Sequence, residues 1–133
     1  MMIFLDTDIM SYFSAGNSVI GAKTKEALNY GHQICLTCVN VYEILKGLRY
    51  NPNKNKELFL TEFLKKVPVI YIEEADIQKA AEIYADLRKN GIIIGDADIF
   101  IASIVMTNGG KLITNNIRHY QNIKGLIVEN WRQ

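Results

Sequence analysis

The start of the chain constrains the fold most strongly. Residues 2–5 are a short apolar run that ends at two carboxylates, Asp6 and Asp8, and a helical pattern of apolar residues follows from Ile9. A run that is apolar on both alternating faces is typical of a strand that helices cover on both sides. Ligands bind outside the carboxyl ends of such strands. The pattern therefore predicts a ligand site at Asp6, and it predicts that Asp8 caps the following helix.

Strands and helices alternate along the rest of the chain. Thr37 is the expected cap of one helix, and Pro68 favours an edge position for its strand because proline lacks an N–H. The alternation predicts a parallel sheet between two layers of helices, a single three-layer α/β domain over residues 1–133. Further strands are expected at 32–36, 67–72, 111–114 and 126–128, and helices at 9–13, 18–30, 38–48, around Leu58 to Leu64, at 73–89, at 97–107 and, as a turn or short helix, at 117–122.

Net charge and hydropathy limit the kinds of protein that this chain can be. With 15 basic and 14 acidic residues the net charge is +1, so any site for a polyanion must be a local patch. No apolar run approaches the roughly 20 residues of a membrane helix, and the first residues lack the pattern of a secretory leader, so we expect a cytoplasmic protein. Cys35 and Cys38 form one C-x-x-C, but neither histidine is spaced as a zinc ligand, so we expect ordinary core thiols.

Asp98 is the clearest candidate among the remaining acids. It shares a helix face with apolar residues three, four and seven positions later, so its carboxylate follows the inward stripe. Burying a carboxylate is costly unless it is paired or coordinates a metal ion. A first-turn acid that interacts with the helix dipole is the alternative. Asp96 lies on a different side of the helix, where capping is the expected role.

Two further residues are expected at the same edge of the sheet. Glu43 lies on a helix that begins just after a strand, although an exposed ion pair with Lys46 is an alternative. Asn116 follows the strand at 111–114 together with Thr114 and Asn115, although a polar turn also explains these residues. Both can reach the cleft beside Asp6.

Asp6, Glu43 and Asp98 together suit Mg²⁺ or Mn²⁺, because these hard ions prefer oxygen ligands and keep several waters. A metal ion bound there lowers the pKa of a water and neutralises charge that develops on a phosphodiester. No phosphate-binding glycine loop or other catalytic motif points to a different chemistry.

Five segments occur in an informative order: LDTDIMS at 5–11, YEILKG at 42–47, IGDADIFIA at 94–102, ITNN at 113–116 and GLIVENW at 125–131. In this order they resemble the PIN-domain ribonucleases of the VapC toxin type. The resemblance implies a parallel sheet with the first strand in the middle, a homodimer, and endonucleolytic cleavage of RNA that depends on Mg²⁺ or Mn²⁺. The RNA is expected to be tRNA or another structured RNA. A cognate antitoxin is expected to block the acidic cleft.

The resemblance also assigns roles to individual residues. Asp6 and Asp98 match the principal metal-binding acids of the family, and Glu43 matches its third acid. Asn116 falls where many relatives have a fourth acid, which weakens the case for a second tightly bound metal ion. Asp96 lies outside the family's acid positions.

Residues that border these acids are candidates for RNA contacts. Lys46, Arg49, Arg118 and His119 are expected to contact phosphates, with solvated surface charge as the alternative. Tyr12 and Tyr120 are candidates for stacking on bases, with packing as the alternative.

Two other functions compete with the nuclease. The segment Asp6-Thr7-Asp8 imitates the D-x-D signature of haloacid dehalogenase-type phosphatases, in which the first Asp is the nucleophile. Met10 stands where that family usually has Thr or Val, and the chain is short for that fold with its cap. A receiver-like or degenerate metal-binding module, with a regulatory role for the same acids, is the other alternative.

Overall fold

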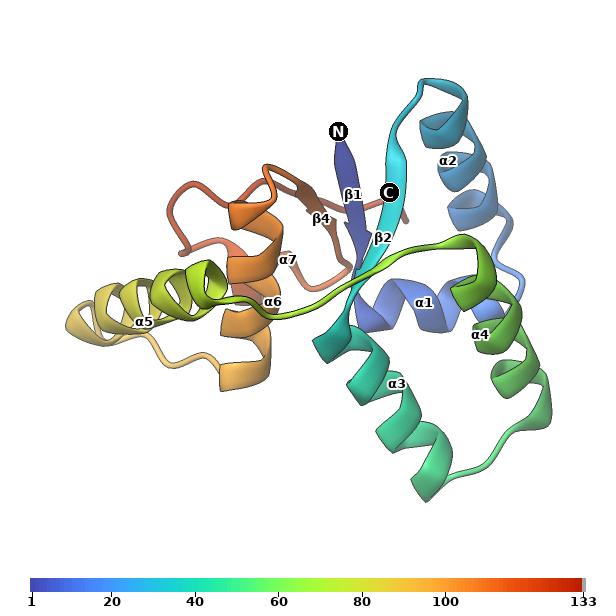
Figure 1. Cartoon of the computed structure of the whole chain (residues 1–133), viewed down its shortest axis with the longest axis horizontal. Helices are drawn as coiled ribbons and strands as arrows, with labels where there is room; N and C mark the ends of the chain where they lie inside the picture. Colours follow the sequence, from blue (N-terminus) through green and yellow to red (C-terminus); the bar gives the residue numbers. More distant parts are fainter. Residues whose placement is uncertain (133) are drawn as a thin grey trace.

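The structure, a computed structural model, describes residues 1–132. Within these residues all strand pairs of the central sheet are parallel, and the strands follow the order β3-β2-β1-β4-β5 (Figure 1). The first strand therefore lies in the middle of the sheet, and the strand after Pro68 lies at an edge, as the sequence predicted. The strands are β1 (Met2–Leu5), β2 (Gln33–Thr37), β3 (Val69–Ile70), β4 (Lys111–Ile113) and β5 (Val128–Glu129).

Helices cover both faces of this sheet. Figure 1 shows α5, α6 and α7 on one side of the central strands and α1, α2 and α4 on the other, while α3 extends from the end of β2. The predicted three-layer α/β architecture is confirmed. The helices of the described part of the chain are α1 (Thr7–Ser14), α2 (Ser18–Asn29), α3 (Cys38–Tyr50), α4 (Lys54–Lys66), α5 (Glu74–Lys89), α6 (Asp96–Thr107) and α7 (Ile117–Tyr120).

Alternate side chains along β1 pack into two separate hydrophobic cores, one on each face of the sheet. Phe4 of β1 packs in the core that α5 and α6 cover, whereas its neighbours Ile3 and Leu5 pack in the core beneath α1, α2 and α4. All three side chains are at most 1% exposed. The run at residues 2–5 is apolar throughout because both of its faces are buried.

The ends of several elements differ from the sequence prediction. The first helix begins at Thr7 instead of Ile9, so Asp6 is its N-cap residue and Asp8 lies in its first turn. The prediction that Asp8 caps this helix is therefore wrong, because β1 passes into α1 with no intervening linker. Asp96 likewise lies in the first turn of α6, where Gly95 is the N-cap residue. Thr37 caps α3 as predicted, through a hydrogen bond from the backbone N–H of Asn40.

The two cysteines lie at the junction of β2 and α3. Cys35 is fully buried in β2, and burial raises the pKa of its thiol to about 11. Cys38 is half-buried, and both thiols are free. The predicted core role of Cys35 is confirmed. Among the helices at residues 1–132, none combines the length and the apolar character needed to cross a membrane.

Gly110 is expected to tolerate no side chain, because β4 starts in close contact with β1. A Cβ atom at Gly110 would lie 2.7 Å from Cε2 of Phe4 and 2.8 Å from the carbonyl oxygen of Met2. We expect Gly110→Ala to lower the free energy of unfolding by about 1–3 kcal/mol, the usual cost of overpacking a core. At Gly21 on α2 a Cβ meets nothing within 4 Å, so Gly21→Ala should stabilise by about 0.5–1 kcal/mol. Chemical denaturation measures both changes, and equal stabilities of the two variants would contradict the packing described here.

Candidate active site

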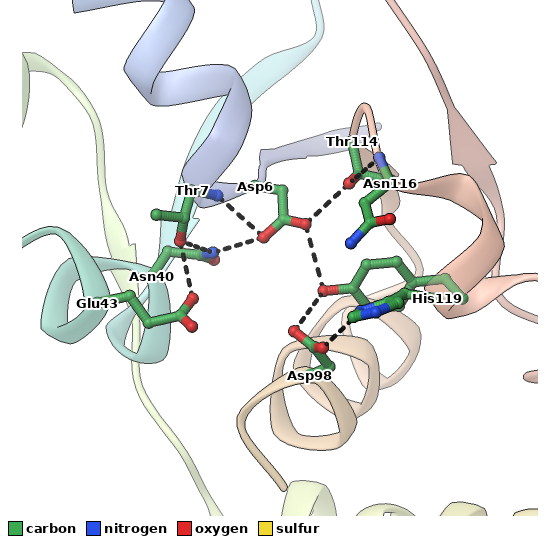
Figure 2. Close-up of polar contacts among 9 residues, drawn as sticks. Asp6, Thr7, Asn40, Glu43, Asp98, Thr114, Asn116 and His119 are labelled. Carbon is green, nitrogen blue, oxygen red and sulfur yellow. Dashed lines mark hydrogen bonds and ion pairs between the residues drawn. The ribbon is translucent and has the colours of Figure 1, made fainter. Parts of the chain in front are cut away.

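Asp6 is the centre of a network of hydrogen bonds at the carboxyl edge of the sheet (Figure 2). Its side chain is buried, and both carboxylate oxygens are held. Oδ1 accepts hydrogen bonds from the backbone N–H of Thr7 at 2.9 Å and from Nδ2 of Asn40 at 3.0 Å. Oδ2 accepts hydrogen bonds from Oγ1 of Thr114 at 2.9 Å and from the hydroxyl of Tyr120 at 3.2 Å. These donors fix the orientation of a carboxylate that water barely reaches.

Burial is the largest influence on the protonation of Asp6. Desolvation raises the pKa of its carboxyl above the usual value, and the negative charge of Asp98 raises it further. The hydrogen bonds from Thr7, Thr114 and Asn40 act in the opposite direction. The site therefore concentrates negative charge where it is poorly solvated.

Tyr120 joins Asp6 to Asp98. Its hydroxyl oxygen lies 3.0 Å from Oδ1 of Asp98 as well as 3.2 Å from Oδ2 of Asp6. A phenol carries one proton, so it donates to one of these carboxylates at a time. Burial raises the pKa of the Tyr120 hydroxyl, and the charges of both carboxylates add to this effect. The residue is 1% exposed, so of the two alternatives for Tyr120 the structure supports packing in the core over stacking on a base.

Besides Tyr120, Asp98 contacts His119 through its second carboxylate oxygen. Nδ1 of His119 lies 3.0 Å from Oδ2 of Asp98, so both oxygens of this carboxylate are engaged. The predicted inward orientation of Asp98 is consistent with its position, since Ile101, Ala102 and Val105 on the same helix face are fully buried.

Glu43 approaches the network from α3. Thr7 donates a hydrogen bond from Oγ1 to Oε1 of Glu43 at 2.8 Å, and Nδ2 of Asn40 lies 3.1 Å from the same Thr7 oxygen. Desolvation raises the pKa of Glu43, and the charges of Asp6 and Asp98 add to the increase. The alternative ion pair with Lys46 is not formed in the described residues. The ammonium of Lys46 lies instead 5.2 Å from the centre of the Tyr42 ring.

Asn116 begins α7 beside the other residues. Its backbone N–H donates to Oγ1 of Thr114 at 3.0 Å, and its side chain, which is exposed, has no hydrogen-bond partner within residues 1–132. Figure 2 shows this side chain on the side of Thr114 that faces the network. The structure thus gathers Asp6, Glu43 and Asp98 into one hydrogen-bonded group and places Asn116 next to it.

Asn40 and Tyr120 are the members of the site that the sequence did not reveal. Asn40 lies three residues after Thr37 and three before Glu43, so all three share a face at the start of α3. That spacing was a usable signal. Tyr120 had been named only as a candidate for base stacking or packing, and no local pattern placed its hydroxyl between Asp6 and Asp98.

The carboxylates do not already form a cage for a metal ion. In the described part of the chain, no three acidic, histidine or cysteine side chains come close enough together to hold one ion directly. The donors are nevertheless hard oxygens. Burial raises the pKa of Asp6 and of Glu43, and the negative charges of neighbouring acids add to this increase. A divalent cation that keeps some of its waters would relieve this repulsion without touching all three acids.

Asp8 lies beside the site but takes no part in the network. Its Oδ2 accepts a hydrogen bond from the backbone N–H of Asn115 at 3.0 Å, whereas Oδ1 is buried without a partner among the described residues. Desolvation, followed by the charge of Asp6, raises the pKa of Asp8 from 3.8 to about 6.

The raised pKa of Asp8 predicts a pH-dependent loss of stability. Between pH 3.8 and about 6 the folded chain holds a proton that the unfolded chain has lost, so Asp8 makes the fold less stable as the pH rises through this window. Because the side chain is only half-buried, solvent screens the effect. We expect Asp8→Asn to gain about 1 kcal/mol relative to the native chain between pH 4.5 and pH 7.5. Urea unfolding in EDTA at both pH values tests this, and a pH-independent difference would contradict it.

Comparison with known proteins identifies the relatives of this chain. The PIN domain family matches residues 3–125. Ribonuclease VapC1 of Rickettsia felis is 31% identical over 134 residues, which cover 96% of this chain and 95% of the relative. The tRNA(fMet)-specific endonuclease VapC of Shigella flexneri is 26% identical over 132 residues, 98% of each chain.

A solved structure supports the same relationship. The crystal structure of VapBC2 from Rickettsia felis, bound to a DNA fragment from its promoter, contains a chain that matches this one with a TM-score of 0.89 and 26% identity. The match covers 98% of this chain and 99% of that one. Sequence and fold therefore agree over nearly the whole length, and this chain belongs to the PIN-domain family, among its VapC-type members.

Proposed function

We propose that this protein is a metal-dependent endoribonuclease, the toxin of a toxin–antitoxin pair. The observation that carries the proposal is the connection of Asp6, Glu43 and Asp98, which come from three different elements and meet at the carboxyl edge of the sheet. The printed names of the relatives, ribonuclease and tRNA(fMet)-specific endonuclease, support RNA as the substrate. The alternative of a haloacid dehalogenase-type phosphatase is wrong, because the chain belongs to the PIN-domain family.

Asp6, Asp98 and Glu43 would hold the Mg²⁺ or Mn²⁺ ion. When bound, such an ion supplies a water of lowered pKa and neutralises charge on the phosphodiester. Asn40 and Thr7 orient Asp6 and Glu43, and Tyr120 sets the separation of Asp6 and Asp98. Oε1 of Glu43 accepts the hydrogen bond from Thr7, whereas Oε2 has no hydrogen-bond partner within residues 1–132, so Oε2 would be the oxygen available to the ion.

The partners follow from the same relationship. Structural relatives of this chain are VapBC complexes, which supports a cognate antitoxin as the partner of this protein. A homodimer and a tRNA or other structured RNA substrate belong to the same proposal. Lys46 lies three residues after Glu43 on α3 and Arg118 two residues after Asn116, and both side chains are exposed and suited to contact the RNA backbone. Of the other two basic candidates, Arg49 pairs with Glu57 at 3.6 Å and His119 pairs with Asp98.

Cleavage of a mixed pool of tRNA and structured RNA tests the function. Purified protein should cut RNA with Mg²⁺ or Mn²⁺ and should stop cutting in EDTA. Cleavage that continues in EDTA would contradict a metal-dependent mechanism. Addition of the cognate antitoxin should suppress the cutting.

A further inference from the structure

A cavity of about 260 Å³ adjoins the acidic site. It lies between α1, α3 and α4, the helices to the lower right of the sheet in Figure 1. Thr7 and Glu43 line this cavity and also belong to the hydrogen-bond network of Asp6. A molecule held at the acids can therefore extend directly into the cavity.

The lining combines an apolar floor with an exposed polar rim. Ile44, Leu48 and Phe59 supply the floor, and Ser11, Asn51 and Lys56 supply the rim. Within residues 1–132 none of these three polar side chains has a hydrogen-bond or ion-pair partner in the fold. Their donors and acceptors are thus available to a ligand.

We propose that this cavity binds the base of the nucleotide next to the phosphodiester that is cut, an inference that rests on the proposed nuclease function. Proteins bind unstacked RNA bases on apolar and aromatic surfaces and hydrogen-bond the edges of those bases. The floor and rim provide these two features, and the ammonium of Lys56 adds a charge that complements phosphate. The cavity is smaller than the roughly 300–1,000 Å³ of sites for drug-sized ligands, which suits a single base.

Gly47 allows the cavity to be closed without disturbing the fold. It lines the cavity on α3, and a Cβ atom there would meet nothing within 4 Å. Gly47→Leu should therefore fill the space. Gly21→Leu is the matched control, because Gly21 is also helical and also has open space around its Cβ position.

The first test compares cleavage of one RNA with and without the base beside the cut. The native protein should cut the complete RNA at least about 5-fold faster than the same RNA with an abasic site at that position. Gly47→Leu should cut both at the abasic rate, and Gly21→Leu should keep the advantage. A base advantage that persists in Gly47→Leu overturns the proposal. If Gly47→Leu instead loses antitoxin binding with that advantage intact, the cavity is a protein-binding site.

A second test separates failure of this site from failure of the nuclease function. Millimolar AMP, GMP, CMP and UMP are titrated into the metal-free protein while the amide NMR signals of Gly47 and Asn51 are followed. At least one nucleotide should shift both signals in the native protein but not in Gly47→Leu, and ribose 5-phosphate, which lacks the base, should shift them clearly less. Equal shifts from ribose 5-phosphate overturn the base site. Nucleotide binding by a protein that cuts no RNA would leave the base site in place and refute the nuclease function alone.

Discussion

Replacing Asp98 with asparagine is expected to abolish metal-dependent RNA cleavage while leaving the protein folded. The carboxylate of Asp98 would hold the ion together with Asp6, and the amide of asparagine cannot supply its charge. We expect cleavage to fall more than about 100-fold, beyond the effect of losing a hydrogen-bond partner of a metal ligand.

The stability of this variant provides a separate readout. The charge of Asp98 raises the pKa of Asp6 and Glu43, so its removal relieves repulsion in the metal-free protein. Unfolding in EDTA should show equal or greater stability than the native chain. Asp96→Asn is the matched control, because Asp96 lies in the same first turn of α6 but is exposed and outside the network. Full cleavage by a folded Asp98→Asn protein would contradict the proposed role of Asp98.

Tyr120→Phe is expected to have the second largest effect. Phenylalanine keeps the buried ring but removes the hydroxyl that bridges Asp6 and Asp98. Without this donor the two carboxylates repel each other directly. We expect cleavage to fall by about 10–100-fold, the range for partners that orient metal ligands.

A positioning role for Tyr120 predicts more than a loss of rate. The Mg²⁺ concentration that gives half-maximal cleavage should rise, and stability in EDTA should fall by about 1–3 kcal/mol because hydrogen bonds to charged groups are lost. Tyr84→Phe is the control, since Tyr84 is 43% exposed on α5 and remote from the network. A Tyr120→Phe variant with native metal dependence and native rate would show that the hydroxyl does not position these acids.

The sequence was most informative where local patterns decide the structure. The run at residues 2–5 is apolar on both faces, and this feature predicted a strand with helices on both sides. Its position in the middle of the sheet followed from the resemblance to PIN-domain ribonucleases. Thr37 was recognised as a helix cap because capping depends on a bond to a residue three positions away. Asp6 and Asp98 were predicted to lie at the same cleft because each acid stands next to apolar residues that the fold buries.

The errors arise where contacts between distant segments decide the outcome. Asp8 was predicted to cap the first helix, but Asp6 is the N-cap residue. The sequence does not show how closely the helix follows the strand. For Tyr120 the sequence left base stacking and packing open, because an aromatic side chain near polar residues is compatible with either role. Only the packing of α7 against the sheet reveals that its ring is buried and its hydroxyl meets two carboxylates.

Binding of Mn²⁺, followed by electron paramagnetic resonance, tests most directly whether these acids form the metal site of the nuclease. The native protein should bind the ion in a saturable manner, and Asp6→Asn, an isosteric change at the centre of the network, should lose this binding while remaining folded. The same native preparation should cut RNA with Mn²⁺, and the variant should not. Native Mn²⁺ affinity in folded Asp6→Asn would contradict the account, because the ion would then be bound elsewhere.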